Sequence, residues 1–112
     1  MPAYLIQAAY STEGWAALLK NPQDRTKAVQ EPIKKLGGKV EKFWFSFGDY
    51  DVIGVLEFPN NVSAAAIAMA FAAGGTIKSV RTTPLLSAED AIDAIKKAAS
   101  CGYKSATAAG GK

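Results

Sequence analysis

Two alternating apolar runs with a short polar turn between them constrain the fold of this chain more than any other feature. Residues 40–47 (VEKFWFSF) and residues 51–58 (DVIGVLEF) each place successive side chains on opposite faces, as a β-strand does. Gly48-Asp49 separates the runs, and glycine readily adopts the positive φ that a tight turn requires. The sequence therefore predicts a β-hairpin in the middle of the chain.

Two further strands flank this hairpin. Residues 3–10 (AYLIQAAY) and residues 76–83 (TIKSVRTT) are rich in β-forming side chains and are bounded by polar or turn-forming residues. We expect them to form the first and the fourth strand, and we expect Pro84 to close the fourth.

Capping residues and glycine pairs indicate where the helices begin and end. Thr12 is expected to cap a short first helix, and the Asn-Pro pair at 21–22 is expected to open a second one. Pro32 lies inside that second helix and should kink or break it. After the hairpin, one of the asparagines at 60–61 caps the next helix. Two glycine pairs are expected to end the main helices, namely Gly37-Gly38 and Gly74-Gly75.

A last helix is predicted after the fourth strand. Residues 87–90 (SAED) form a variant of the capping box that often opens a helix. Ile92, Ile95 and Ala99 fall on one face of this helix, and we expect that face to pack inward. No periodicity follows Gly102. The predicted organisation is therefore one domain over residues 1–101 and a flexible tail over residues 102–112.

The order of the elements, β-α-β-β-α-β with a terminal helix, predicts an α+β fold of the ferredoxin-like type. Its sheet would have four antiparallel strands, and right-handed crossovers would place both main helices on the same face. The residues expected on the opposite, uncovered face are Leu5, Gln7, Ala9, Trp44, Ser46, Ile53, Val55 and Arg81.

This uncovered face predicts self-association. Trp44, Ile53 and Val55 together would expose a larger apolar patch than a monomer usually carries. A second subunit that packs sheet on sheet would cover the patch. We therefore predict a homodimer with the architecture of a dimeric α+β barrel.

Composition excludes several classes of protein. The net charge of +3 is small and the thirteen lysines and arginines are scattered, so no nucleic-acid surface is expected. No run reaches the roughly 18 apolar residues of a membrane span, and the first residues lack the pattern of a signal peptide. Cys101 is the only cysteine, which excludes an internal disulfide and fits a reducing compartment. A cytoplasmic location is predicted.

The absence of histidine restricts the chemistry further. It excludes a histidine general base, a Ser-His-Asp or Cys-His nucleophile, histidine-rich metal sites and histidine-ligated haem. We expect no metal site and no cofactor. Any catalysis would depend on carboxylates, tyrosine, lysine or arginine.

Residues 35–60 (KLGGKVEKFWFSFGDYDVIGVLEFPN) and residues 80–85 (VRTTPL) resemble the GYD-domain family, a group of small bacterial proteins named for a Gly-Tyr-Asp motif. The similarity extends over about residues 3–100. The sequence departs from the family pattern at Asp49, which is inserted in the motif, at Pro32 and in the tail after Cys101.

The resemblance implies membership of the dimeric α+β barrel superfamily, which also contains cofactor-free monooxygenases, lactone isomerases and stress-response barrels. The biochemical role of the family is not defined. The resemblance therefore implies no catalytic residues, and only the motif positions Gly48, Tyr50 and Asp51 carry over.

Three residues are candidates for catalysis. Asp51 and Tyr50 follow the hairpin turn, where Asp51 could act as a base and Tyr50 as a hydrogen-bond donor. The alternative is that Tyr50 packs at the end of the sheet and Asp51 caps backbone donors. Glu57 is a candidate acid or base near a strand end, and an ion pair with Arg81 or Lys42 is the simpler interpretation.

The uncovered sheet face supplies candidates for binding. Arg81 could anchor a carboxylate, a phosphate or an enolate in an apolar cavity between two sheets. A plain dimer interface is the simpler interpretation, because tryptophan and arginine are enriched at interfaces. The predicted ligand-binding residues are Gln7, Trp44, Ser46, Tyr50 and Arg81.

Three functions remain open from sequence. The first is a homo-oligomeric barrel protein that binds a small organic ligand between its sheets. The second is a cofactor-free oxygenase or isomerase that acts on an acidic, enolisable substrate. The third is a structural or regulatory module without a ligand. The identity of a substrate or ligand is not encoded in any motif of this chain.

Overall fold

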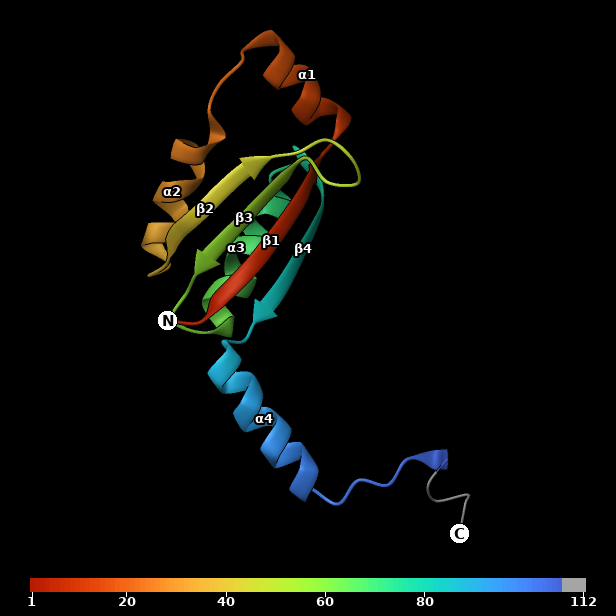
Figure 1. The fold of residues 1–112 in the computed structure, drawn as a ribbon. Coiled ribbons are helices and arrows are strands. Elements are labelled where there is room, and N and C mark those ends of the chain that lie inside the picture. The colour runs from red at the N-terminus through yellow and green to blue at the C-terminus, as the bar shows by residue number, and fades with distance from the viewer. Residues whose placement is uncertain (108–112) are drawn as a thin grey trace.

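The structure is a computed structural model that describes residues 1–107. Figure 1 shows a sheet with the first helix beyond one end and a last helix that extends away from the other end. This architecture confirms the predicted α+β, ferredoxin-like fold. The elements in chain order are β1 (Ala3–Tyr10), α1 (Thr12–Lys20), α2 (Arg25–Lys35), β2 (Lys39–Phe45), β3 (Val52–Glu57), α3 (Asn61–Ala73), β4 (Ile77–Leu85) and α4 (Ala88–Ser100).

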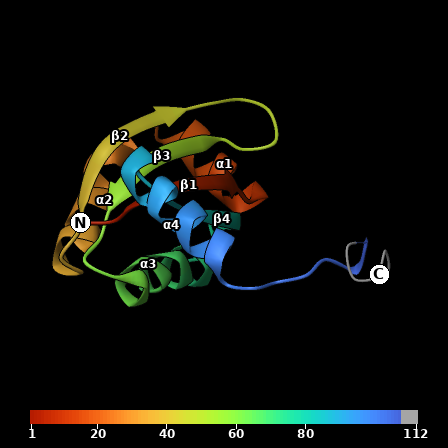
Figure 2. The ribbon, with the colours of Figure 1, turned by 60° about the horizontal axis from the view of Figure 1, so that its bottom comes forward.

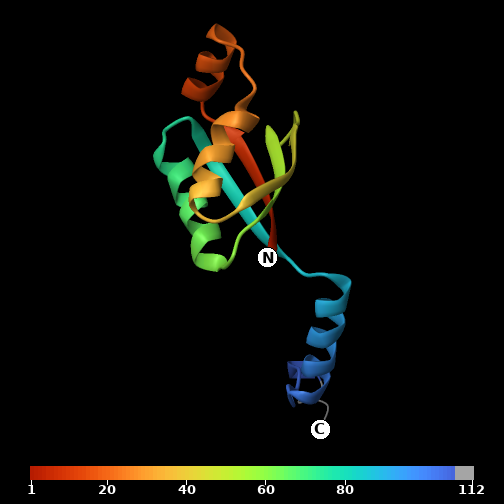
Figure 3. The ribbon, with the colours of Figure 1, turned by 90° about the vertical axis from the view of Figure 1, so that its left-hand side faces the viewer.

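The four strands pair in the order β2-β3-β1-β4, and every neighbouring pair is antiparallel. α2 and α3 lie on the same face of the sheet, as right-handed crossovers require (Figure 3). The opposite face carries no helix of residues 1–107, and we call it the open face. The predicted arrangement of the two main helices is confirmed.

The hydrophobic core lies between the sheet and these two helices. Its largest fully buried side chains come from β1, α2, α3 and the residue that follows β3, namely Tyr4, Ile33, Ile67 and Phe58. The rings of Tyr4 and Phe58 meet edge to face with 5.9 Å between their centroids. The core therefore ties both helices to the central strands.

Two helix starts differ from the prediction. Ser11, and not Thr12, is the N-cap of α1, because its hydroxyl accepts the backbone N–H of Gly14 at 3.1 Å. Asp24 caps α2 by accepting the N–H of Thr26 at 2.9 Å, whereas Asn21 is the C-cap of α1. Capping side chains stood at neighbouring positions, and the geometry of the chain decided which of them was used.

Pro32 does not break α2, which continues for three residues beyond it to Lys35. The carbonyl of Pro32 accepts the N–H of Leu36 at 3.2 Å. Proline removes one donor, yet the tertiary packing of the neighbouring Ile33, which is buried, holds the helix in place. The predicted glycine stops are confirmed, since Gly37 and Gly75 have φ values of 82° and 85°.

The hairpin is longer than predicted. β2 ends at Phe45 and β3 begins at Val52, so a six-residue loop replaces the shorter turn expected between residues 47 and 51. Ser46 closes the loop by donating its N–H to the carbonyl of Asp51 at 2.8 Å. Gly48 has a φ of 157°, which side chains disfavour, and Phe47 is fully exposed at the tip.

The strand β4 continues through Pro84 to Leu85, so the prediction that Pro84 closes it is wrong. Pro84 lies opposite Tyr4 in the register with β1. β4 is an edge strand, and a proline is tolerated there because one side of the strand needs no ladder hydrogen bond.

The predicted inward packing of the last helix is also wrong. α4 buries none of its residues and extends beyond the end of β4 (Figures 1 and 2). Ile92 is 52% exposed and Ile95 is 65% exposed. The predicted tail lies partly outside the described residues, because it includes residues 108–112.

Candidate functional site

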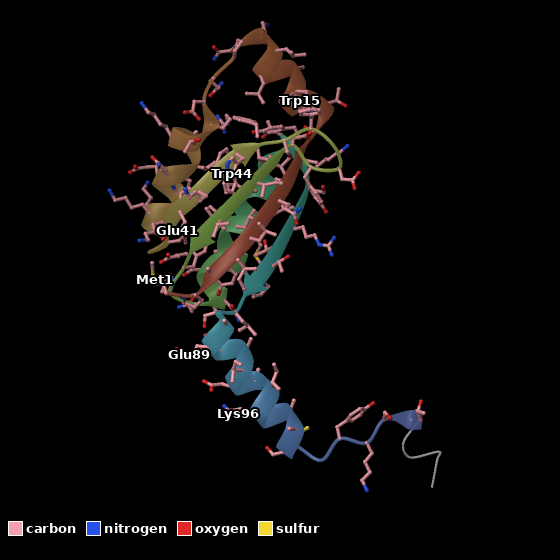
Figure 4. The ribbon with its side chains drawn as sticks, viewed as in Figure 1. Met1, Trp15, Glu41, Trp44, Glu89 and Lys96 are labelled. Carbon is pink, nitrogen blue, oxygen red and sulfur yellow. The ribbon has the colours of Figure 1, made fainter. Side chains whose placement is uncertain are left out.

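The register of the strands gathers three of the predicted site residues on the open face. Trp44 pairs with Ile53, Ile53 with Gln7, and Gln7 with Arg81, so these four side chains form one row across all four strands. Directly paired residues lie on the same face of an antiparallel sheet. Trp44 is 52% exposed and lies on β2 (Figure 4).

A second row lies beside the first. Lys42 pairs with Val55, Val55 with Leu5, and Leu5 with Thr83. The open face therefore combines an apolar centre with cationic residues, Lys42 and Arg81, at its two edges. An apolar centre with a polar rim is the usual composition of a protein interface.

The other two predicted ligand residues lie in the hairpin loop. The hydroxyl of Ser46 donates to the carbonyl of Tyr50 at 2.7 Å. This contact joins the two ends of the loop. The five residues predicted to bind a ligand thus fall into two groups, with Gln7, Trp44 and Arg81 on the sheet and Ser46 and Tyr50 in the loop.

Asp51 links the hairpin loop to the central strand. Its carboxylate accepts the backbone N–H of Tyr10 at 2.8 Å, and its own N–H donates to the carbonyl of Ala8 at 2.8 Å. Both contacts continue the pairing with β1 to the residue that precedes β3. Asp51 therefore accepts a backbone donor, as the structural alternative expected, but that donor lies on β1, far away in sequence, and is not local.

Glu57 lies at the opposite end of β3 from Asp51. The two residues are six positions apart in extended chain, which corresponds to about 20 Å. The candidate catalytic residues therefore lie at the two ends of the sheet, with Asp51 and Tyr50 at one end and Glu57 at the other.

Glu57 belongs to a charged cluster with Glu41 and Lys39 on the edge strand β2 (Figure 4). Its hydrogen bond with Glu41 raises the pKa of Glu57, and desolvation and the charge of Glu41 act in the same direction. The pKa of Glu41 is lowered by the same hydrogen bond and by Lys39, whose Nζ lies 3.3 Å from the Glu41 carboxylate. The two carboxyl groups share one proton more readily than isolated glutamates do.

We expect Glu57→Gln to raise the melting temperature slightly at pH 7 and to leave it unchanged near pH 3.5. A raised pKa means that the folded chain binds this proton more tightly than the unfolded chain does. The stability contributed by the proton is therefore lost as the pH rises through the pKa of Glu57, and glutamine removes that loss. Thermal denaturation across pH 3.5–7 measures the effect. Glu31→Gln, an exposed change on α2, is the control, and an equal response of both variants would contradict the shared proton.

A cavity of about 220 Å³ lies on the other face of the sheet, between the strands and the helices α2 and α3. Its walls are almost entirely apolar. The lining residues include Ile6, Ala8, Val29, Ile33, Phe43, Val52, Gly54, Leu56, Ala70, Phe71 and Ile77.

Polar groups lie at one end of this cavity. Tyr10, Arg25 and Thr76 line it where β1 ends, α2 begins and β4 is about to begin. An adjoining cavity of about 100 Å³ is also lined by these three residues. Aromatic packing holds Tyr10 in place, because its ring meets the ring of Trp15 edge to face at 5.2 Å.

The phenol of Tyr10 is a hydrogen-bond donor at neutral pH. Burial raises its pKa, and the carboxylate of Asp51 acts in the same direction, whereas the charge of Arg25 opposes both. Tyr10 is only 7% exposed. The cavity end therefore contains a protonated phenol and a guanidinium, which are donor groups of the kind that suits an anionic or electron-rich group.

The cavity exists because several residues that face it are small. Gly54 lies in the middle of β3 between Ile6 and Phe43, and Ala8 and Ala70 face the same space. Tyr10 and Arg25 are not among the site residues predicted from sequence. A glycine inside a strand is the one signal that pointed here, because such a glycine often marks a close approach or a missing side chain.

Two further findings concern the described part of the chain. Residues 1–107 contain no cluster of three or more cysteine, aspartate or glutamate side chains that could hold a metal ion. Among the helices of the same residues, none is both long and apolar enough to span a bilayer.

Comparison with known proteins identifies a family. A relative from Thermus thermophilus, named glutamine synthetase and cystathionine beta-lyase binding protein, is 25% identical over 80 residues, which cover 71% of this chain and 84% of the relative. No solved structure is significantly similar. The family model of the GYD domain matches residues 4–95, which include the whole sheet apart from its first residue. The chain belongs to the GYD domain family.

Proposed function

We propose that this protein is a binding protein whose cavity holds a small, mainly apolar organic molecule with an anionic or hydrogen-bond-accepting group. The observation that supports this is the cavity between the sheet and α2 and α3, with Tyr10 and Arg25 at one end. A few convergent polar groups in an apolar pocket are typical of ligand sites. The ligand would lie on the helix side of the sheet, and not between two sheets as we expected from sequence.

The volume and polarity of the cavity indicate the kind of ligand. A cavity of about 220 Å³ exceeds the roughly 150 Å³ that accepts benzene in another protein. One substituted aromatic ring therefore fits. Its apolar body would contact Phe43 and Phe71, and a carboxylate or phenolate would accept hydrogen bonds from Arg25 and Tyr10.

Calorimetric titration with benzoate, phenylacetate and simple phenols tests the proposal, together with the variant Gly54→Val. A Cβ at position 54 would meet the Lys42 carbonyl at 3.4 Å and the Phe43 ring at 3.6 Å, which are ordinary contacts. Valine also suits a strand better than glycine does. We expect Gly54→Val to weaken binding at least about tenfold, because its methyl groups occupy the ligand volume, without lowering the melting temperature.

Two variants make this experiment specific. Val55→Ile adds a methylene group to the open face of the same strand, so it should leave binding unchanged. Arg25→Gln should weaken the binding of carboxylates more than that of neutral phenols. Absence of binding by every probe at millimolar concentration, or equal binding by the wild type and Gly54→Val, would rule out the cavity as the site.

Self-association through the open face is the second part of the proposal. Trp44, Ile53 and Val55 form the apolar centre of that face, and none of the described helices covers it. A second copy would remove this patch from water. Light scattering coupled to size-exclusion chromatography gives the mass in solution, and Trp44→Asp is expected to reduce it. A wild-type chain that stays monomeric at about 100 μM, a concentration chosen for the test, would contradict self-association.

A protein partner is a second candidate function, because the Thermus relative is named for binding two enzymes. Interferometry with purified glutamine synthetase tests it for this chain, and no response at micromolar concentration would exclude that enzyme. The hypotheses of an oxygenase or isomerase and of a cytoplasmic location stay predictions. None of Asp51, Tyr50 and Glu57 lines the cavity.

A further inference from the structure

The helix α4 is well formed but has nothing to pack against in the described part of the chain. Its N-cap is Ser87, whose hydroxyl accepts the N–H of Asp90 at 3.0 Å, and acidic residues in its first turn complement the helix dipole. Ile92 and Ile95 are separated by three positions and therefore lie on the same face. With the alanines at helical spacing they form what we call the α4 stripe, which consists of Ala88, Ala91, Ile92, Ile95 and Ala99.

The extended position of α4 leaves this chain with more surface than a compact monomer. Its radius of gyration is 18.4 Å, whereas a compact domain of this length has about 13 Å. Its accessible surface is 7841 Å². A compact monomer of this size exposes about 5,900 Å², so the excess is about 1,900 Å². A stable dimer buries about 800 Å² on each partner, and the excess surface of this chain is larger than that area.

We propose that the α4 stripe of one copy docks onto the open face of the sheet of a second copy, and that the exchange is reciprocal. This proposal rests on the self-association proposed above and specifies which segment covers the open face. It identifies α4 as the contact between the two copies, in place of direct packing of sheet on sheet.

The two surfaces match in polarity. The α4 stripe is apolar and would lie on Leu5, Ile53 and Val55, at the centre of the open face. Glu89 and Lys96 flank the stripe on one side of α4, and the open face carries Lys42 and Arg81 at its edges. An orientation that brings Glu89 to one of these cations and keeps Lys96 away from both is favoured.

The dimensions also agree. A helix of 13 residues is about 20 Å long, and the eight-residue central strand β1 is about 27 Å long. The whole stripe therefore fits within the sheet face.

A second copy is favoured over the sheet of the same chain. Only Leu86 and Ser87 connect β4 to α4, and α4 continues past the end of the sheet instead of returning over it (Figure 1). Figure 3 shows α4 beyond the sheet and displaced to the side opposite α2 and α3, which is the side of the open face. In this position α4 can reach the open face of a second copy that lies opposite the open face of the first.

The first test measures mass in solution for the full chain and for Ile92→Asp/Ile95→Asp. We expect the wild type to be dimeric and the variant to self-associate at least about 100-fold more weakly, because two charges enter an apolar contact. Lys97→Asp introduces the same residue on the outer face of α4 and should remain dimeric. Circular dichroism confirms that the variants are folded, and folding should be intact because α4 buries no residue.

The second test locates the contact by disulfide formation in a Cys101→Ser background, which removes the only cysteine. Ile95→Cys and Val55→Cys are made in separate chains, which are then mixed and oxidised. We expect a disulfide-linked pair of chains. A chain that carries both Ile95→Cys and Val55→Cys tests whether α4 docks on its own sheet. A disulfide formed within one chain, at the mass of a single chain, would show such docking and would overturn the proposal.

The outcomes distinguish self-association through the open face from docking of α4 onto that face. A monomeric wild type contradicts both self-association and α4 docking. A dimer that is lost in Trp44→Asp but retained in Ile92→Asp/Ile95→Asp supports self-association through the open face and overturns α4 docking, since the sheets would then pack directly. Loss of the dimer in both variants, with the mixed disulfide, supports α4 docking.

Discussion

Replacing Phe58 with alanine is expected to lower the free energy of unfolding by about 4 kcal/mol. Phe58 has no exposed surface and packs its ring against Tyr4 at the base of the core. Ile33 of α2 and Ile67 of α3 belong to the same buried cluster. Removal of the ring leaves a cavity among elements that are held by the sheet, so the surrounding side chains cannot collapse fully into the space.

Phe47→Ala is the matched control for this variant. Phe47 is 100% exposed at the tip of the hairpin loop, so the same change of side chain removes no buried contact. We expect its effect to stay within about 0.5 kcal/mol. Urea denaturation followed by circular dichroism measures both variants, and comparable destabilisation of the two would mean that the core is not centred on Phe58.

Asp51→Ala is expected to destabilise the fold by about 2 kcal/mol. The carboxylate of Asp51 accepts the backbone N–H of Tyr10 at 2.8 Å, and Tyr10 is buried. Alanine leaves that donor without its charged acceptor at the point where β1 meets the hairpin loop. Hydrogen bonds to charged groups contribute more than neutral ones do, and an unsatisfied buried donor adds a desolvation cost.

Asp49→Ala provides the comparison, because Asp49 is exposed in the same loop and carries the same charge. Equilibrium unfolding in urea should show little change for Asp49→Ala. If the two variants unfold alike, Asp51 does not stabilise the junction with β1. A catalytic role for Asp51 stays a separate prediction, which a structural loss on its own does not address.

The strands were predictable because their signal is local. Alternation along residues 3–10 matches β1 at both ends, and the pattern around Trp44 and Ile53 correctly assigned these residues to the uncovered face. The alternation of a strand has a period of two residues, so neighbouring residues in the sequence are enough to identify it. The order of the elements then restricts the topology, because crossovers between parallel strands in such units are right-handed.

Boundaries were less predictable where two residues could serve the same purpose. Ser11 and Thr12 are both good caps, and Asn21 and Asp24 compete in the same way before α2. The hydrogen bond of Ser11 to the Gly75 carbonyl at 2.9 Å, far away in sequence, favours the observed choice at α1. The length of the hairpin loop likewise follows from contacts of Asp51 with β1, which no local pattern encodes.

The sequence by itself determined the class of the fold, the two faces of the sheet and the existence of an amphipathic last helix. Tertiary structure decided where α4 lies and where a cavity opens. A hydrophobic stripe specifies that a surface needs a partner, because apolar area is unfavourable in water, but it does not specify which surface that partner offers. The cavity likewise depends on Ala8, Gly54 and Ala70, which are far apart along the chain and meet only when the sheet and α3 are packed together.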